Sequence, residues 1–198
     1  MKYKSDENYS HGDERKIGIL LVNLGTPDAP TTSAVRKYLA EFLADPRIVE
    51  IPRIIWWLIL NLIILNIRPK KSRDLYKKVW TQDGSPLLVT SKKIVNKLKK
   101  SKNISSDKNL SIDLAMRYGN PSIKKALDNF KDNNINRLAI IPMFPQYSAA
   151  TTASIFDKIS SEIKLWRNIP DVRFLSTYHD EPSYILACAE RIKTFWKS

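Results

Sequence analysis

Four short segments that follow apolar runs hold the side chains of this sequence with the clearest chemical potential. They carry a glycine turn, an Arg-Tyr pair, a Phe-Pro-Gln-Tyr sequence and a Tyr-His-Asp-Glu sequence, at residues 23–27, 117–121, 144–148 and 178–182. Aromatic rings stack on flat ligands and bind cations, and guanidinium groups bind carboxylates through paired hydrogen bonds. If these segments meet in the fold, they favour a large planar anionic ligand.

A parallel sheet is the element that would bring these segments together, and the sequence predicts one. Apolar runs typical of buried strands lie at residues 17–23, 112–116, 137–143 and 172–177. Patterns of helical period follow them at 32–43, 122–130, 150–166 and 183–196, with two more at 72–80 and 87–102. This alternation indicates βαβ units, so we expect an α/β fold with a doubly wound parallel sheet and right-handed crossovers. Ligands of such sheets bind beyond the carboxyl ends of the strands, where the four segments fall.

The first crossover contains the most apolar stretch of the chain, residues 53–68, which is closed by an arginine at each end. Burying one large apolar side chain is worth roughly 1.5–3 kcal/mol, so the run needs a core, a partner, a membrane or an apolar ligand. It is shorter than the about 20 residues of a spanning helix. A buried core helix stays open, but paired tryptophans and flanking cations favour an interfacial segment. The residues expected to meet the membrane are Ile54, Ile55, Trp56, Trp57, Leu58 and Ile59.

The charge of the chain points to an anionic partner. The 198 residues carry a formal net charge of +13, and their hydrophobic fraction of 43% suffices for the core of one domain. Such a charge favours a membrane surface or nucleic acid. The lysines are spread along amphipathic segments such as 91–100, as on a solvated helix face, without a zinc-finger or RNP-type motif. We therefore expect a membrane surface and no nucleic acid.

Glycine and cysteine usage argues against several common sites. The first turn holds only Gly25, without the glycine-rich fingerprints that bind dinucleotides or triphosphates. The single Cys188 lies in an apolar helical pattern and is expected in the core, and one thiol makes neither an internal disulfide nor a cysteine metal site. Residues 1–16 lack the apolar region of a secretory signal, so we expect a cytoplasmic protein.

Four separated motifs resemble the ferrochelatases, enzymes that insert ferrous iron into protoporphyrin to form haem. The motifs are GILLVNLGTP, DGSP, MRYG and FPQYS, at residues 18–27, 83–86, 116–119 and 144–148. The resemblance runs from about residue 17 to residue 198 and implies a chelatase-like domain of Rossmann-type topology. It implies a polar extension at 1–16 and a helical lip insertion at about 51–80. It further implies that the full enzyme has a second, similar domain, which we expect to be absent from this chain.

The resemblance also implies which side chains contact the porphyrin. These residues are Leu24, Gly25, Arg68, Lys71, Tyr76, Ser85, Arg117, Tyr118, Phe144 and Gln146. By the resemblance, Leu24 faces the porphyrin centre, and Gly25 lets the backbone come close to it. Arg117 and Tyr118 would lie at the base of the cleft. For Arg68, which would lie near the propionates, a cation that only flanks the apolar run remains the alternative.

The family places its metal-inserting histidine in a later Ser-x-His motif. No catalytic residue and no metal ligand are therefore expected in this chain, and the isolated chain is expected to be inactive. Ferrous iron is then a substrate, and no permanently bound cofactor is expected. Members with an iron–sulfur cluster carry a cysteine where this sequence has Ala149, so no cluster is expected either.

The expected function is that of the porphyrin-gripping half of a ferrochelatase, a metal-inserting lyase of haem biosynthesis. The expected partners are protoporphyrin, ferrous iron and a membrane surface. The expected location is the cytoplasm, with peripheral attachment to the inner membrane. The alternative is a non-catalytic domain that binds porphyrin or a membrane surface and is complete as it stands.

Overall fold

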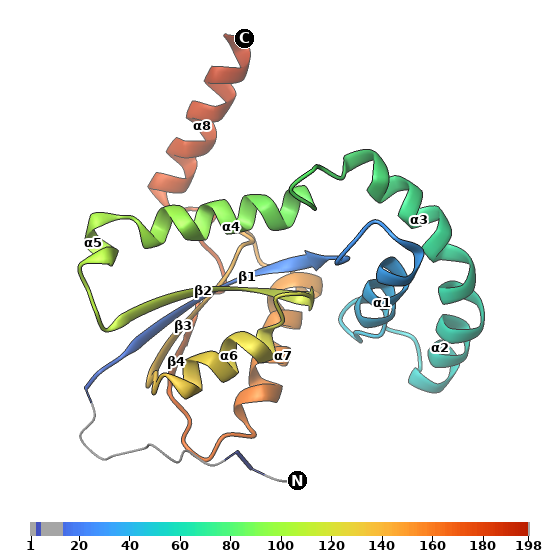
Figure 1. Cartoon of the computed structure of the whole chain (residues 1–198), viewed down its shortest axis with the longest axis horizontal. Helices are drawn as coiled ribbons and strands as arrows, with labels where there is room; N and C mark the ends of the chain where they lie inside the picture. The colour runs from blue at the N-terminus through green and yellow to red at the C-terminus, as the bar shows by residue number, and fades with distance from the viewer. Residues whose placement is uncertain (1–2, 5–13, 198) are drawn as a thin grey trace.

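A four-stranded parallel sheet lies at the centre of the computed structural model, which describes residues 3–4 and 14–197 (Figure 1). The strands lie in the order β2-β1-β3-β4, and every neighbouring pair is parallel. Their bounds are β1 Ile17–Thr26, β2 Leu110–Gly119, β3 Arg137–Pro142 and β4 Asp171–Phe174. The expected α/β class with a doubly wound parallel sheet is confirmed. Most of the expected extension at 1–16 lies outside the described residues.

Helices cover both faces of the sheet. They are α6 (Ile123–Asp132) and α7 (Ser154–Ile163) on one face and α4 (Pro86–Lys99) on the other. In β1, Leu20 packs on the first face and Leu21 on the second, as the two-residue period of a strand requires. Because both faces of β1 are buried, its sequence is a continuous apolar run and does not alternate with polar residues.

Further helices of the described chain connect the strands or extend from the sheet. They are α1 (Thr32–Leu43), α2 (Arg53–Ile59), α3 (Leu65–Val79), α5 (Lys102–Ser105) and α8 (Pro182–Trp196), with the π-helical turns η1 (Leu60–Ile64) and η2 (Ala149–Ala153). Side-chain caps fix two of the helix starts. Thr31 Oγ1 accepts a hydrogen bond from Ala34 N at 3.3 Å before α1, and Ser122 Oγ accepts one from Lys125 N at 3.2 Å before α6. These bonds satisfy backbone donors that a helix leaves unpaired, so both helices begin close to their predicted starts.

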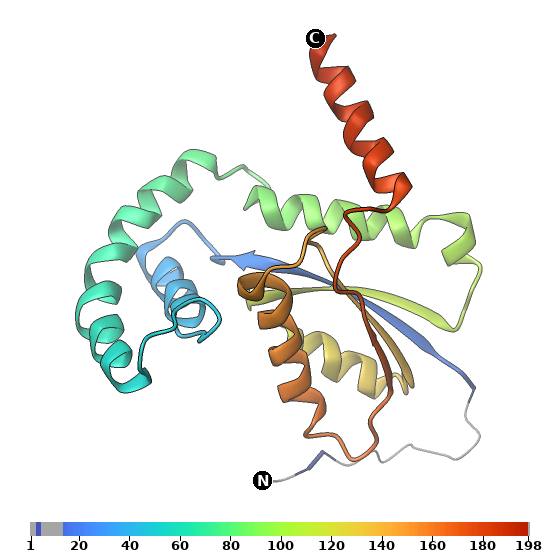
Figure 2. The same ribbon diagram turned by 180° about the vertical axis from the view of Figure 1, so that it is seen from behind.

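One continuous helical arm projects beyond the carboxyl end of β1 (Figures 1 and 2). It comprises α2, η1 and α3, from Arg53 to Val79, and is called the lip helix below. The sequence pattern predicts a separate helix at 72–80, but the chain stays helical throughout, although Pro69 lies inside α3 and has no N–H to donate. Asn61 and Asn66 each donate a side-chain amide at 2.8 Å to the carbonyl oxygen four residues earlier. The side-chain amide N–H groups of both asparagines in the apolar run therefore find acceptors within the helix itself.

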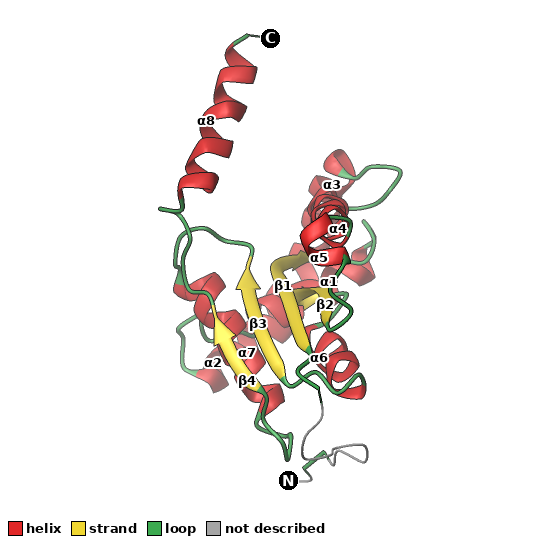
Figure 3. Cartoon of the chain, turned by 90° about the vertical axis from the view of Figure 1, so that its left-hand side faces the viewer, coloured by secondary structure: helices red, strands yellow, loops and turns green. Residues whose placement is uncertain are grey.

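Helix α8 extends away from the rest of the domain (Figure 3). None of its described residues is buried. The apolar helical pattern predicted a core position for Cys188, but this cysteine is exposed, so the prediction is wrong. The apolar spacing in α8 indicates a helix face that is suited to burial, but no other helix or strand of the described chain covers that face.

Candidate functional site

The carboxyl ends of β1 and β2 form the floor of the candidate site, and both strands run further than predicted. Gly25 pairs with Tyr118, and Thr26 pairs with Gly119. Gly25 has a φ of 112°, and a Cβ at this position would lie 1.8 Å from the carbonyl oxygen of Tyr118. The approach of β2 therefore accounts for this glycine, and its expected role beside a ligand stays a prediction.

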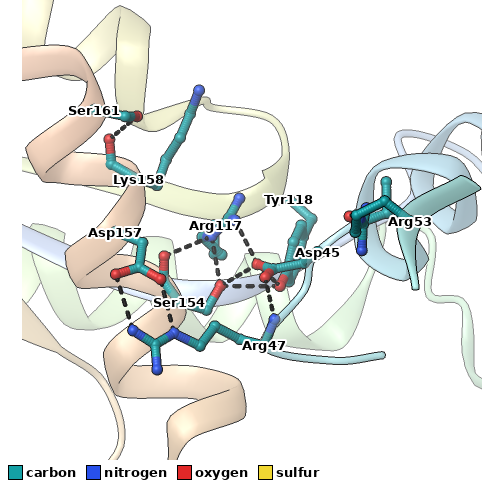
Figure 4. A network of polar contacts seen from close by, with 10 residues as sticks. Asp45, Arg47, Arg53, Arg117, Tyr118, Ser154, Asp157, Lys158 and Ser161 are labelled. Carbon is teal, nitrogen blue, oxygen red and sulfur yellow. Dashed lines mark hydrogen bonds and ion pairs between the residues drawn. The ribbon is translucent and has the colours of Figure 1, made fainter. Parts of the chain in front are cut away.

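A carboxylate that the sequence analysis missed, Asp45, lies at the centre of a polar network (Figure 4). Its Oδ2 accepts hydrogen bonds from Arg117 Nη2 at 2.5 Å, from the Tyr118 hydroxyl at 2.8 Å and from Ser154 Oγ at 2.5 Å. Its Oδ1 accepts the backbone N–H of Arg47 at 2.7 Å. Arg117 Nε donates to the carbonyl oxygen and to Oγ of Ser154, at 2.9 and 2.7 Å. The network thus joins the loop after α1 to the end of β2 and to the start of α7.

Burial sets the electrostatics of this network. Asp45 is 5% exposed and Tyr118 is fully buried, while the Arg117 side chain retains 12% exposure. Burial raises the pKa of Asp45, but hydrogen bonds from Ser154, the Arg47 backbone and Tyr118, together with the charge of Arg117, outweigh it and lower the pKa below its ordinary value. Burial raises the pKa of the Tyr118 phenol well above its ordinary value. Near neutral pH, Asp45 is therefore ionised and Tyr118 is a neutral donor.

Arg117 and Tyr118 lie together at the end of β2, but only one of them reaches the surface. The Tyr118 hydroxyl donates inward to Asp45, and its ring packs edge-on against Phe42 with the centroids 5.1 Å apart. The phenol is not available to a ligand in this arrangement, which corrects its expected role. The local signal for Asp45 was its place before Pro46, two residues after the end of a predicted helix. An Asp-Pro pair indicates a turn, not a buried ion pair.

The loop from residue 45 to residue 52, called the root below, ties the lip helix to the domain. Arg47 and Asp157 of α7 form a two-point ion pair, with Nε and Nη2 at 2.7 and 3.2 Å from the carboxylate oxygens. This ion pair is partly exposed, and none of its hydrogen bonds involves Arg117. The root is therefore held to α7 at two places, once by Asp45 and once by Arg47.

The first turn of the lip helix closes the end of α1. The Arg53 guanidinium donates to the carbonyl oxygen of Ala44, and the Trp56 indole donates to that of Leu43 at 2.7 Å. Carbonyl groups at the end of a helix lack partners within it, so these side chains satisfy them. Trp56 is 9% exposed and belongs to a buried cluster, which corrects its expected place on the membrane lip.

The other expected lip residues lie mostly in solvent. Ile54 is 81% exposed and Trp57 is 61% exposed, and Ile55 and Leu58 are exposed as well. Ile59 is half-buried and packs against the same cluster as Trp56. The exposed apolar surface continues past the expected residues to Leu62, Ile63 and Ile67.

The remaining expected site residues are distributed over three environments. Leu24 and Tyr76 are half-buried against the cluster that contains Trp56 and Tyr118, whereas Phe144 packs against the core under α6 and α7. Ser85 is buried at the start of α4. The exposed residues of the set are Arg68, Lys71 and Gln146. The structure therefore brings Leu24 and Tyr76 together with Tyr118 but places Phe144 in a separate cluster.

Asp45→Asn is expected to lower the free energy of unfolding by about 3 kcal/mol at pH 7, because it leaves a largely buried Arg117 without its counter-charge. The pKa of Asp45 is lower in the folded than in the unfolded protein. The contribution of this carboxylate is therefore complete above the unfolded value of about 3.9 and is lost as the pH falls through the folded value. Urea unfolding from pH 7 to pH 2 should show the two proteins converging in stability below about pH 4. A constant difference down to pH 2 would contradict an ionised Asp45.

No group of three or more histidine, cysteine, aspartate or glutamate side chains in residues 3–4 and 14–197 is arranged to hold a metal ion. In the same part of the chain, no helix combines the length and the apolar character needed to cross a membrane.

Comparison with known proteins gives a consistent result over nearly the whole chain. The family model described as Ferrochelatase matches residues 16–198. A ferrochelatase of Marinobacter nauticus is 50% identical over 196 residues, which cover 99% of this chain and 53% of that protein. One of Alcanivorax borkumensis is 50% identical over 195 residues, covering 98% of this chain and 57% of that protein. Ferrochelatase 2 of Shewanella oneidensis is 50% identical over 184 residues, covering 92% and 56% respectively. The chain thus spans about half the length of these relatives.

Proposed function

The chain belongs to the ferrochelatase family, and from this membership we propose that it supplies the porphyrin-gripping half of an enzyme that inserts ferrous iron into protoporphyrin to form haem. The observation that carries the proposal is the lip helix. It projects beyond the carboxyl end of β1 with large apolar side chains in solvent. A flat hydrophobic macrocycle with acidic edges would bury those side chains and place its carboxylates near cations.

Metal insertion is difficult because the flat macrocycle must pucker while two N–H protons leave. Binding energy gained along the edges of the ring can be used for that distortion. In our proposal the lip helix supplies the apolar contact, and the exposed Arg68 and Lys71 of α3 hold the propionates. Arg117, at the end of β2, offers one further cation at the base.

Removal of the two protons requires a base, and in our proposal no residue of this chain acts as that base. A neutral imidazole with a pKa near the working pH is suited to the task. His179 lies exposed in the loop after β4, and His11 lies outside the described residues. We propose that the 198-residue chain alone does not insert iron, which is a substrate in this scheme. The single Cys188 cannot hold an iron–sulfur cluster, so none is part of the proposal.

The exposed lip also supports peripheral binding to a membrane. Tryptophan favours the boundary between headgroups and acyl chains, and cations near it attract anionic lipid. Trp57 is exposed on α2, and Arg68, Lys70 and Lys71 follow on α3. We propose attachment at the surface of the inner membrane from the cytoplasmic side, with the lip helix as the contact.

The isolated chain is expected to bind protoporphyrin without inserting iron. Protoporphyrin fluorescence should change on titration with protein, but adding ferrous iron anaerobically should cause no loss beyond that in buffer. Arg68→Ala with Lys71→Ala should weaken binding about tenfold, because two cations near the acidic edges are removed. Lys92→Ala with Lys93→Ala removes two exposed charges from α4 and serves as the matched control.

Each result of this titration has a distinct meaning. Iron-dependent loss of fluorescence would overturn the claim that the base is missing. An equal effect of the two double variants would show that net charge, and not the lip, binds the ligand. Vesicle binding without any porphyrin binding would favour the alternative, a membrane-surface domain, which the exposed apolar lip also suits.

A further inference from the structure

We propose that Asp45 is a positioning residue that orients the Arg117 guanidinium toward the porphyrin site and couples this orientation to the root of the lip. The inference rests on the proposed function, because it assumes that Arg117 meets the ligand. It goes beyond that function by giving a role to a carboxylate that does not itself face the ligand.

The hydrogen bonds of Arg117 fix the plane of its guanidinium. Nε donates to both oxygens of Ser154, and Nη2 donates to Oδ2 of Asp45. Ser154 Oγ also donates to Asp45, so the two acceptors are held relative to each other. Within the described chain, Nη1 has no such partner. The arrangement therefore leaves one edge of a rigid guanidinium available to an acceptor on a ligand.

Charge supports the same assignment. Asp45 is the one acidic side chain in the described chain that forms an ion pair with Arg117. An unpaired guanidinium with this degree of burial is unfavourable and would turn toward solvent to recover hydration. Asp45 prevents that movement, so the cation stays at the end of β2 before any ligand binds. A site prepared in this way loses less entropy on binding than one that must order its side chains.

Asp45 is also the first residue of the root. Its backbone carbonyl accepts the N–H groups of Ile48 and Val49, at 3.0 and 3.1 Å, and its Oδ1 accepts that of Arg47. One residue thus fixes both the turn that leads into the lip helix and the guanidinium at the sheet edge. A shift of the root would therefore move the acceptor of Arg117.

The test is a double-mutant cycle on protoporphyrin binding by the 198-residue chain. The variants are Asp45→Asn, Arg117→Ala and their combination, with affinity measured by porphyrin fluorescence and folding by circular dichroism. Each single variant is expected to weaken binding about tenfold, and the combination should be no weaker than Arg117→Ala alone. Asp157→Asn is the control, because it removes the Arg47 contact between the root and α7 but leaves the bonds of Asp45 to Ser154 and Arg117 in place. The affinity of this variant should stay within about twofold of the parent.

The outcomes separate this proposal from the proposed function. If Arg117→Ala leaves affinity unchanged, Arg117 does not meet the porphyrin and both claims about it fall, while the lip variants still test the function. If Asp45→Asn and Arg117→Ala are additive, or if Asp157→Asn matches Asp45→Asn, positioning is overturned and Asp45 only stabilises the root. Should Asp45→Asn not fold, Asp45→Glu and Ser154→Ala replace it. Both substitutions disturb the hydrogen bonds that orient Arg117. Each is then expected to weaken protoporphyrin binding in the parent chain but to have no further effect in the Arg117→Ala background.

Discussion

Gly25→Ala is expected to destabilise the domain by about 4 kcal/mol or more, enough to prevent folding of a protein of ordinary stability. The new Cβ would lie 1.8 Å from the carbonyl oxygen of Tyr118, which belongs to the backbone of the neighbouring strand and cannot rotate away. β1 and β2 would have to separate at the carboxyl end of the sheet, next to Arg117 and Asp45. Soluble expression and urea unfolding followed by circular dichroism measure the effect.

Gly84→Ala is the matched control for this prediction. Gly84 has a φ of 113°, nearly the same as the 112° of Gly25, but a Cβ there would meet no atom within 4 Å. Its substitution therefore reports backbone strain alone, which is worth about 1–3 kcal/mol. A loss for Gly25→Ala no larger than that for Gly84→Ala would mean that the strands adjust easily and that the close approach to Tyr118 is not essential.

The sheet could be predicted because its strands are marked by local sequence. In β1, consecutive apolar residues such as Leu20 and Leu21 face opposite buried layers, so the run stands out in any short window. The ends of the strands were predicted less well. β1 continues to Thr26 because Gly25 tolerates the contact with Tyr118, and nothing within β1 itself reveals what the neighbouring strand requires.

The polar network was missed because its members are far apart in the chain. Asp45 is 72 residues from Arg117 and 109 from Ser154, and neither Asp45 nor Ser154 lies in a motif that the sequence marks. The sequence directed attention to Arg117 through its place after the predicted strand at 112–116. It could not show that the guanidinium is already paired, because its partner Asp45 lies in the loop between α1 and α2, far away in the sequence.

The lip helix illustrates a different limit of sequence reasoning. The run from 53 to 68 is apolar on nearly every side, so no period distinguishes the face that packs from the face that is free. Trp56 and Trp57 are adjacent and chemically identical, yet one caps α1 and the other lies in solvent. The core interpretation therefore holds for the side of the run that contains Trp56, and the interfacial interpretation stays a prediction for the exposed side.

Replacing Ile54, Trp57 and Leu62 together with serine is expected to reduce binding to anionic vesicles by about a hundredfold or more. Burial of each such side chain is worth roughly 1.5–3 kcal/mol, so even partial insertion of three amounts to about 3 kcal/mol. All three are more than half exposed, so the sheet should stay folded. Co-sedimentation with vesicles containing phosphatidylglycerol measures binding, and circular dichroism checks the fold.

Two controls decide whether the lip itself is responsible. Ile169→Ser, Ile185→Ser and Leu186→Ser together remove three exposed apolar side chains outside the lip and should leave vesicle binding nearly unchanged. Trp56→Ser is expected to destabilise the protein by about 3–5 kcal/mol, because it empties a packed site and frees the Leu43 carbonyl. Equal losses of binding in the two triple variants would indicate general hydrophobic adhesion. If Trp56→Ser retained the stability of the parent, the contact between Trp56 and α1 would not anchor the lip helix. The root, on which the orientation of Arg117 depends, would then not be held through Trp56.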